Sequence, residues 1–329
     1  MNDLNISTKA PNTTETAIGF IPCYRLPFLS LYQIDVLEGF KNIPDKSQDL
    51  IIADPPYYKA INEGWDKQWK TETEYLDWCK LWFNQCVRVL KDTGSFYCYG
   101  NFDILSKQKV LIFDKELNFR QNITLNKGLK SIAGRTSDIL RMFPTASEYL
   151  IFYVKQEMSI TSPFKKILDI QMQSKQLREI DFRKLRPSKN GNLTGWCSNI
   201  LKDKNLPTKE DWDLICNLIE VDSSNYSELY ELHQSNRFTF NLPYATTDVW
   251  DFTPDKVRYG HPTQKPQGIC QRIIKASSNE NDNVLIPFAG SGSEIVGCKE
   301  LNRNCIAFEI ESKYIDIIKQ RTNDAGTLF

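Results

Sequence analysis

The sequence predicts an α/β fold in which helices cover both faces of a mostly parallel, twisted sheet. From about residue 30 to residue 155, short apolar segments typical of strands alternate with segments of helical periodicity. Between residues 156 and 245 the chain becomes polar and rich in Asn and Ser, and the alternation stops, although a short helix is expected near Asp211–Glu220. It returns after residue 246 as a strand, a glycine turn, a helix and a further strand. An inserted region therefore interrupts one large α/β domain.

The composition excludes a membrane span, a disulfide scaffold and a cysteine-based metal site. The chain has 329 residues, of which 41% are hydrophobic and 25% charged, and its formal net charge is zero. Its nine cysteines form no Cys-x-x-Cys pair, so we expect buried free thiols in a reducing cytoplasm. We find no signal peptide and no apolar run long enough to cross a bilayer. Residues 1–15, rich in Asn and Thr, are expected to form a flexible tail.

The first half of the domain alternates between strand and helix patterns. Leu31–Ile34 and Leu50–Ala53 are apolar runs of strand length, and Val36–Phe40 between them has a helical pattern. Thr71 and Glu74 form a capping-box signature. They open a predicted helix with an apolar face made of Leu76, Cys79, Phe83, Cys86 and Leu90. We then expect a strand, a helix and two further strands, at Gly94–Tyr99, Phe102–Glu116, Phe119–Leu125 and Glu148–Val154.

The turn Asp54-Pro55-Pro56-Tyr57 directly follows the predicted strand Leu50–Ala53. The two prolines stiffen the turn. It brings together a carboxylate, a carbonyl and an aromatic ring, a set that suits an exocyclic amino group on a flat heterocycle. Asp54 and the Pro55 carbonyl can each accept one amino hydrogen, and Tyr57 can stack on the ring. The structural alternative is a stiff loop with a capping aspartate.

The C-terminal end contains a ligand-binding pattern. A strand at Val284–Phe288 is followed by the turn Ala289-Gly290-Ser291-Gly292-Ser293 and a helical pattern, and the glycines allow backbone to approach a ligand closely. The next strand, Asn304–Phe308, ends at Glu309, an acid placed to accept hydrogen bonds from ribose hydroxyls. Ser312 is expected to cap the following helix. Because the turn lacks the Lys-Ser/Thr pair of phosphate loops, it fits an adenosyl ribose better than a nucleotide phosphate.

A third motif, His261-Pro262-Thr263-Gln264-Lys265-Pro266, precedes a predicted helix, with Pro266 near its first turn. Lys265 supplies a cation, and the other polar side chains of the motif supply hydrogen-bonding groups. The structural alternative is a polar loop that caps the helix. The chain has only two histidines, and one of them lies in this motif, which favours a functional role.

Together the three motifs resemble those of S-adenosylmethionine-dependent DNA amino-methyltransferases. Their order, with Asp-Pro-Pro-Tyr first and the glycine turn last, is similar to that of the β group of this family. The resemblance covers about residues 30–155 and 245–320. It implies a Rossmann-like methyltransferase fold with a catalytic half at residues 16–155, a target-recognition region at 156–245 and a cofactor-binding half at 246–329.

The resemblance also implies the cofactor and the residues that bind it. The cofactor would be S-adenosylmethionine, leaving as S-adenosylhomocysteine, without a metal. Asp35 would accept a bond from its adenine amino group or, alternatively, only cap the helix at Val36–Phe40. Lys265 would face its carboxylate, and Phe288 would lie against it. The catalytic residues implied are Asp54, Pro55, Pro56 and Tyr57; those for the cofactor are Asp35, Asp54, Pro55, His261, Thr263, Gln264, Lys265, Phe288, Ala289, Gly290, Ser291, Gly292, Glu309 and Ile310.

The implied reaction is methyl transfer to N6 of an adenine that has been flipped out of double-stranded DNA. N4 of cytosine has the same amino geometry, but in the family Asp at the first motif position goes mostly with adenine and Ser mostly with cytosine. RNA and protein-glutamine methyltransferases usually carry Asn in place of Asp54 and have the cofactor half first. The alternative from a different class is a catalytically silent DNA-binding subunit. A homodimer and a cognate restriction endonuclease stay open as partners in a bacterial or phage setting.

Two basic segments are candidate DNA contacts. The loop Asn126–Met142 has four cations against a single acid, and nine Lys/Arg against four Asp/Glu lie between Lys155 and Lys189. The alternative is a solvated charged face. Trp65 and Trp69, in the loop after the catalytic turn, either flank a flipped base or pack against the protein. The residues expected to contact DNA are Lys127, Lys130, Arg135, Arg141, Arg183, Lys184 and Arg186.

One position departs from the family pattern. Ile286 stands before Pro287-Phe288, where relatives often have an acid. An isoleucine cannot form a hydrogen bond to a ligand, so the departure bears on the affinity for the methyl donor. Because relatives vary at this position, we still expect the donor to bind.

Overall fold

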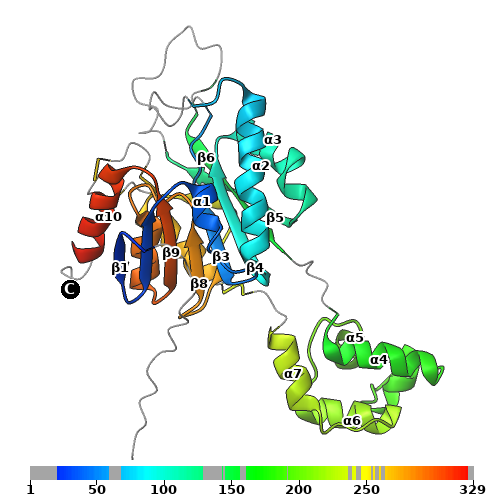
Figure 1. Ribbon diagram of the computed structural model, residues 1–329. Helices are drawn as coiled ribbons and strands as arrows, with labels where there is room; N and C mark the ends of the chain where they lie inside the picture. Colours follow the sequence, from blue (N-terminus) through cyan, green and yellow to red (C-terminus); the bar gives the residue numbers. More distant parts are fainter. Residues whose placement is uncertain are drawn as a thin grey trace, which may run out of the picture. The chain divides into compact units, whose positions relative to one another are not determined.

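The computed structural model describes residues 21–58, 68–128, 143, 145–155, 161–190, 192–235, 239–241, 246–252, 255, 259–260 and 264–324. The chain forms two compact units, one made of Met1–Lys155 with Thr239–Phe329 and the other of Gln156–Phe238. The first unit contains a sheet with helices packed on it, and the second is helical (Figure 1). Each unit has its own hydrophobic core.

The sheet of the first unit is mostly parallel. Strands β2, β9, β8, β3 and β4 run parallel to one another, and β7 runs parallel to β5. Only β1 with β2, and β6 with β4 and β5, are antiparallel pairs among the described strands. The predicted α/β fold is therefore confirmed. In spatial order the nine described strands are β1 (Tyr24–Leu26), β2 (Leu29–Gln33), β9 (Asn304–Glu309), β8 (Asn283–Ile286), β3 (Gln48–Ala53), β4 (Leu90–Gly100), β6 (Ser147–Val154), β5 (Asn118–Asn126) and β7 (Val249–Asp251).

The central strands are buried toward their carboxyl ends because both faces of the sheet are covered there. Residues 50–53 of β3 and 95–100 of β4 are all buried, so neither strand alternates between apolar and polar residues. Ile286, the last residue of β8, is 1% exposed and pairs with Ala307. At the position of the expected acid, the chain therefore has a side chain that packs in the core.

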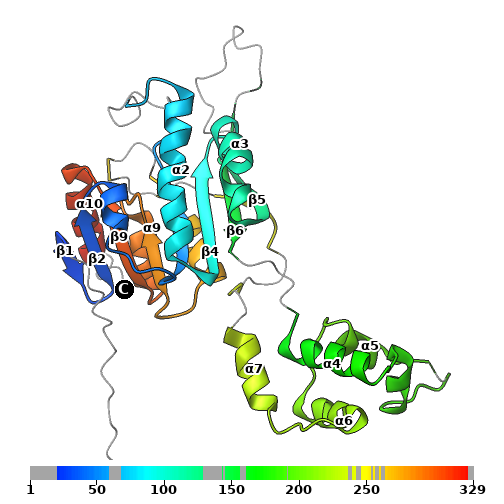
Figure 2. The ribbon, with the colours of Figure 1, turned by 45° about the vertical axis from the view of Figure 1, so that its right-hand side comes forward.

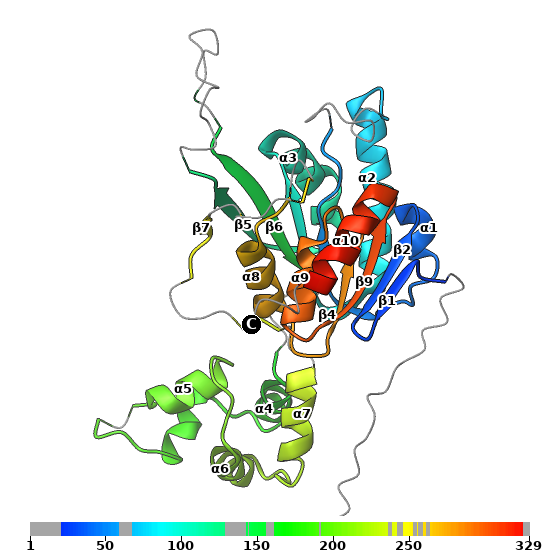
Figure 3. The same ribbon diagram turned by 90° about the vertical axis from the view of Figure 1, so that its left-hand side faces the viewer.

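Helices cover the two faces of the sheet in two groups. Figures 1 and 2 show α1 (Val36–Phe40), α2 (Glu72–Val89) and α3 (Phe102–Leu111) on one face, with α2 running along β4. Figure 3 shows α8 (Gln267–Ser277), α9 (Ser293–Glu300) and α10 (Ser312–Asp324) on the other. None of the described helices combines the length and apolar character that a membrane span requires.

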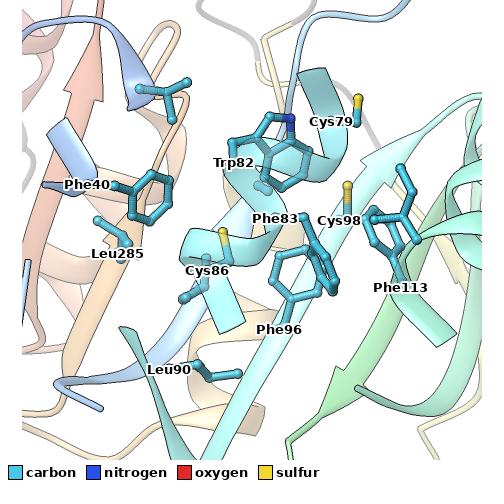
Figure 4. Packing of buried hydrophobic residues seen from close by; sticks show 14 of the residues in the cluster. Phe40, Cys79, Trp82, Phe83, Cys86, Leu90, Phe96, Cys98, Phe113 and Leu285 are labelled. Carbon is cyan, nitrogen blue, oxygen red and sulfur yellow. The ribbon is translucent and has the colours of Figure 1, made fainter. Parts of the chain in front are cut away.

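An aromatic cluster fills the space between α2 and the sheet (Figure 4). Phe83 of α2 lies 5.3 Å from Phe96 of β4 and 4.5 Å from Phe113, between ring centroids. Trp82 and Phe83 are fully buried. Three cysteines, Cys79, Cys86 and Cys98, are part of the same cluster. All nine cysteines are free thiols and eight of them are buried, as the sequence predicts.

The second unit is built from short helices around its own core. Phe164 and Trp212 pack edge to face at 5.0 Å between ring centroids, and both are buried. Thr208 and Asp211 form a complete capping box at the start of the helix Lys209–Ile219. The described elements are α4 (Pro163–Ser174), a 3-10 helix (Glu179–Lys184), α5 (Gly195–Leu201), α6 (Lys209–Ile219) and α7 (Tyr226–Ser235). The sequence predicts only the helix near Asp211–Glu220.

Several element boundaries differ from those expected. The helix expected over Phe102–Glu116 ends at Leu111 and continues as a short 3-10 turn over Phe113–Lys115. Thr71 caps α2, because its hydroxyl oxygen accepts a hydrogen bond from the Glu74 N–H. The Glu74 carboxylate accepts from the Lys70 N–H, and not from the N–H of the cap residue Thr71 as in a capping box. The last helix, α10, begins at Ser312 itself, so Ser312 is its first residue and not its cap.

We predict that the second unit unfolds separately from the first. Trp212→Ala should remove about 3–5 kcal/mol of stability from the second unit, because truncating a buried Trp leaves a large cavity. Hydrogen exchange should show lost protection in residues 161–235 and unchanged protection in β3 and β4. Trp82→Ala serves as the matched control and should give the opposite pattern. Equal loss of protection in both units would contradict the prediction.

Candidate active site

The predicted motifs meet at one edge of the sheet. Asp54 follows β3, the glycine turn follows β8, and Glu309 ends β9, and these three strands are parallel neighbours. Because β6 is antiparallel to β4, its first residues lie at the same edge, where Tyr149 pairs with Gly100. This places Glu148, which neighbours Tyr149, at the edge as well. Open α/β sheets bind their ligands at the carboxyl ends of their parallel strands.

The turn after β3 is held in place by three hydrogen-bonding groups. The Tyr57 hydroxyl donates to Asp54 Oδ1 at 2.8 Å, and Lys265 Nζ lies 3.0 Å from the same oxygen. Lys265 Nζ also donates to the Tyr57 hydroxyl at 3.1 Å. The Pro56 carbonyl accepts a bond of 2.9 Å from the Tyr75 hydroxyl of α2. The aspartate, the tyrosine and the turn's backbone are thus fixed to one another, to residue 265 and to α2.

Lys265 is buried within a group of acidic and aromatic side chains. Its side chain is only 5% exposed, and Nζ lies 3.8 Å from Glu148 Oε2. The ring centroid of Tyr99 is 4.8 Å from Nζ. Lys127, which directly follows β5, pairs with the other oxygen of Glu148. The sequence does not single out Glu148, because an acid at the start of an antiparallel strand carries no motif of its own.

The burial of these charges shifts their pKa values. Burial raises the pKa of Asp54, and the Lys265 ammonium opposes this rise. Burial alone would also raise the pKa of Glu148, but the ammonium groups of Lys265 and Lys127 hold it below its ordinary value. For Lys265 burial acts to lower the pKa, yet the carboxylates of Asp54 and Glu148 outweigh burial and raise it. The ammonium therefore stays charged.

The glycine turn is shaped by close packing and by Glu309. Gly292 has φ 77°, and a Cβ there would lie 2.8 Å from Ile318, so both its backbone and its surroundings require glycine. The Gly290 N–H donates to Glu309 Oε2 at 2.7 Å, and the Glu311 N–H donates to Oε1 at 2.8 Å. Glu309 therefore holds the turn that precedes α9, in addition to standing where the sequence predicts a ribose contact.

Arg321 of α10 ties the glycine turn to the Lys265 backbone. Its Nη1 donates to the Ser291 carbonyl at 2.7 Å, to Ser291 Oγ at 3.0 Å and to Ser293 Oγ at 3.1 Å. Ser293 Oγ in turn donates to the Lys265 carbonyl at 2.8 Å. Sequence reasoning misses Arg321, since a single arginine in an amphipathic helix looks like any surface residue. It is only 5% exposed.

Two predicted cofactor contacts have structural partners. Phe288 packs against Trp78 and Trp82 of α2, at 5.8 and 5.3 Å between ring centroids. Asp35 Oδ1 accepts the Leu37 N–H at 2.9 Å and so caps α1, which is the structural alternative for this residue. The predicted contacts of both residues with a donor remain predictions.

The third motif is described only in part, since residues 261–263 lie outside the described residues. Gln264 accepts the Tyr259 N–H at 3.1 Å and donates to Asp255 at 3.2 Å. Pro266 is the N-cap of α8, close to the predicted place. The expectations for His261 and Thr263 therefore stay predictions.

The residues predicted to contact DNA fall into three groups. Lys130, Arg135 and Arg141, like Trp65, lie outside the described residues. Arg183 and Lys184 are exposed in the second unit. Lys127 and Arg186 already have acidic partners. Arg186 lies 2.7 Å from Asp211 and 4.3 Å from the Trp196 ring centroid. Trp69 packs on Tyr75 and Trp78, which favours the packing alternative for this residue.

The arrangement can bind and orient a neutral amino group next to a nucleoside ligand. Asp54 offers a carboxylate oxygen, and Tyr57 a half-buried ring, beside a glycine turn whose acid suits ribose hydroxyls. Within the described ranges, no group of three or more His, Cys, Asp or Glu side chains could hold a metal ion.

Comparisons with known proteins show the family of the chain. Residues 48–320 match the N6/N4 DNA methylase family. The chain is 27% identical to the type II methyltransferase M.HinfI of Haemophilus influenzae over 307 residues, which cover 88% of this chain and 67% of that relative. It is 29% identical to the DNA adenine methyltransferase YhdJ of Escherichia coli over 299 residues, which cover 89% and 82% of the two chains.

Two solved structures share the fold. The cytosine-N4-specific PvuII DNA methyltransferase matches with a TM-score of 0.57 and 14% identity, over 92% of this chain and 89% of that one. The complex of M1.HpyAVI with SAM matches with a TM-score of 0.50 and 20% identity, over 89% and 99% of the two chains.

We predict that Glu309 makes the protein less stable as pH rises. Burial raises its pKa to about 7 in the folded chain, against 4.5 for an ordinary Glu, so the folded state binds the proton more tightly than the unfolded state. The free energy of unfolding should therefore fall between pH 4.5 and about 7, by at most about 3 kcal/mol. In urea unfolding, Glu309→Gln should lack this fall in the free energy of unfolding with pH, whereas the exposed control Glu116→Gln should keep it. Identical pH dependence in both variants would refute the assignment.

Proposed function

Because this chain belongs to the N6/N4 DNA methylase family, we propose that it transfers a methyl group from S-adenosylmethionine to N6 of a flipped-out adenine in double-stranded DNA. One observation carries the proposal. The Asp54 carboxylate is fixed by Tyr57 and Lys265 at the edge where the glycine turn also lies. A group that accepts amino hydrogens therefore stands next to a site suited to an adenosyl donor.

The residues at the glycine turn fit the methyl donor. Gly290 and Gly292 both have positive φ, a backbone conformation that favours glycine and permits the tight turn at this edge. Glu309 lies where its oxygens can accept hydrogen bonds from ribose hydroxyls. Phe288, backed by Trp78 and Trp82, offers an aromatic wall. When bound, S-adenosylmethionine supplies a methyl group activated by the sulfonium.

The catalytic turn acts on the target amino group. The lone pair of an exocyclic amino group is delocalised into the ring, which makes the nitrogen a poor nucleophile. Asp54 and the Pro55 carbonyl accept its two hydrogens and so favour a localised lone pair directed at the methyl carbon. Tyr57 stacks on the flipped base and offsets part of its unstacking cost, which is a few kcal/mol. Positioning and electrostatics then supply most of the rate enhancement.

The choice of adenine over cytosine rests on Asp54, since the family resemblance links Asp at this position mostly with adenine. N4 of cytosine has the same amino geometry and is the second candidate target. We assign recognition of the target sequence to the second unit, where Arg183 and Lys184 are exposed and can contact phosphates. In this proposal the protein acts on double-stranded DNA in the cytoplasm.

Mass spectrometry of nucleosides tests the reaction directly. Unmethylated bacterial DNA is incubated with the protein and S-adenosylmethionine labelled in the methyl group. Labelled N6-methyladenine supports the proposal, and sequencing of the modified sites then gives the recognition sequence. Labelled N4-methylcytosine retains the reaction but changes the base. Absence of label in DNA, with donor binding demonstrated, would refute the proposed function.

We predict that Asp54→Ala abolishes methyl transfer and leaves donor binding nearly intact. Losing an electrostatic partner of the reacting group costs about 10²–10³-fold in rate in comparable sites. Single-turnover transfer and calorimetry with S-adenosylhomocysteine measure the two effects. Asp92→Ala is the matched control, because Asp92 pairs with Lys46 near the opposite end of β3. If Asp54→Ala keeps turnover, Asp54 does not have the proposed role.

Phe288→Ala should weaken donor binding by roughly tenfold, which corresponds to about 1.4 kcal/mol of lost contact. The physical reason is the loss of an aromatic wall next to the glycine turn. Phe119→Ala, near the amino end of β5, removes a ring of the same size away from the site and should leave donor affinity unchanged. Equal donor affinity of wild type and Phe288→Ala by calorimetry would remove Phe288 from the donor pocket.

A further inference from the structure

Four charged side chains of alternating sign connect the catalytic turn to the end of β5. Asp54 Oδ1 lies 3.0 Å from Lys265 Nζ, which lies 3.8 Å from Glu148 Oε2. The other oxygen of Glu148 pairs with Lys127. Their side-chain exposures are 18% for Asp54, 5% for Lys265, 16% for Glu148 and 32% for Lys127. The chain of charges therefore runs from a buried centre toward the solvent.

The Lys265 ammonium is directed at protein groups. It bonds to Asp54 Oδ1 and to the Tyr57 hydroxyl, and Glu148 lies on another side of it. The family resemblance instead implies that this lysine faces the carboxylate of the methyl donor. An ammonium already held between two carboxylates gains little from a third anion, because moving toward it would leave the Asp54 carboxylate buried without a cation.

We propose that Lys265 acts on Asp54 and not on the donor's carboxylate, and that Glu148 is a positioning residue that holds Lys265 in place. The proposal rests on the proposed function, because Asp54 has to accept a target amino hydrogen for this arrangement to matter. Glu148 contacts no reacting group. It acts through the lysine.

The geometry gives Lys265 two effects on Asp54. Lys265 and Tyr57 both bond to Oδ1, so Oδ2 is the oxygen left for the amino hydrogen of the target base. The cation also favours the ionised carboxylate, which accepts hydrogen bonds, over the protonated form, which has to donate one. Burial pushes in the opposite direction, toward the protonated form. Lys265 therefore opposes the effect of burial and favours the ionised, accepting form of Asp54.

The other titratable groups around this pair do not replace Lys265. Tyr57 and Tyr99 have pKa values raised by burial and stay neutral, as do Cys98 and Cys270. Glu294 of α9 is a further buried acid near Lys265 and Asp54, and its pKa is raised by burial and by the charge of Asp54. Lys127 pairs with Glu148. Within the described chain, Lys265 is thus the cation in direct contact with Asp54.

Three variants and a control separate the two effects. Lys265→Met removes the charge, Lys265→Arg keeps it with a different shape, and Glu148→Gln removes the partner of the lysine. Lys46→Met is the control. Lys46 lies just before β3, at the opposite end of that strand from Asp54, and pairs with Asp92. For each protein, single-turnover transfer of labelled methyl groups to DNA is measured over a range of pH. Calorimetry with S-adenosylhomocysteine gives donor affinity on the same samples.

The expected results differ between the variants. In Lys265→Met the pKa of Asp54 rises, so the acidic limb of the pH–rate profile moves upward by about one pH unit or more, which is a loss of about tenfold in rate on that limb. Donor affinity should change by less than about twofold, well below the tenfold effect of a lost contact. Lys265→Arg should keep the limb near its wild-type position with a lower maximal rate.

Glu148→Gln is expected to behave differently from Lys265→Met. Removing the negative charge of Glu148 lowers the pKa of Asp54, so the acidic limb should not move upward. A positioning role instead predicts a rate that is lower at every pH, by roughly 10- to 100-fold, as for small misplacements of catalytic groups. Lys46→Met should match the wild type in rate, pH profile and donor affinity.

Each outcome bears on the inference. A Lys265→Met variant with wild-type pH profile and at least about tenfold weaker donor binding would show that the lysine faces the donor, and would overturn the proposal. A Glu148→Gln variant with wild-type rates would overturn the positioning role. If Lys265→Met does not fold, Lys265→Arg and Glu148→Gln decide the result. If the wild-type protein transfers no label to DNA, the proposed function is overturned as well. If the wild type labels DNA but the acidic limb of the Lys265→Met pH–rate profile does not move, only this inference is overturned.

Discussion

The parallel pairing of β3 with β8 is the contact on which the site depends. Leu50 pairs with Val284 and Ile51 with Leu285, so two segments more than 200 residues apart in the sequence end at the same edge of the sheet. Because parallel strands have their carboxyl ends together, the turn after β3 and the turn after β8 become neighbours without any direct bond between them. A slip of one residue in this register would turn the side chains of β8 to the opposite face and displace the glycine turn along the edge.

Helix α2 serves both halves of the site. Its Tyr75 hydroxyl bonds to the Pro56 carbonyl, and its Trp78 and Trp82 pack on Phe288 of the glycine turn. The same helix places Phe83 and Cys86 in the aromatic core against β4. Because large side chains in a close-packed core have little freedom to move, the Asp54–Tyr57 turn and the Phe288 ring share one rigid support. The far side of the glycine turn is held by Arg321 from α10, so helices on both faces of the sheet fix this one loop.

The sequence was sufficient to predict the fold class and the parts of the site that lie on motifs, and insufficient for the parts that act through tertiary contacts. Strand-length apolar runs gave β3, β4, β6, β8 and β9 within a few residues, because strands covered on both faces are apolar throughout. Glu309 was singled out because an acid has a fixed place at the end of the second strand of such a unit, and the structure shows it holding the glycine turn, while its ribose contact stays a prediction. Glu148 and Arg321 were missed because no local pattern distinguishes a buried charge with a distant partner from an exposed one. Apart from α6, the helices of the second unit were missed because they are short and strongly polar on their outer faces, so their apolar residues appear isolated in the sequence.

The order of the strands along the chain also has a consequence during protein synthesis. β3 and β4 can pair as soon as both have left the ribosome, but the other edge of β3 has no partner until β8 follows, and at about 5–20 residues per second this takes on the order of ten seconds or more. During that interval an apolar strand edge is open to pairing with other chains. The nascent protein would therefore benefit from chaperones that cover this edge, and slow translation of the segment between β6 and β8 would lengthen its exposure.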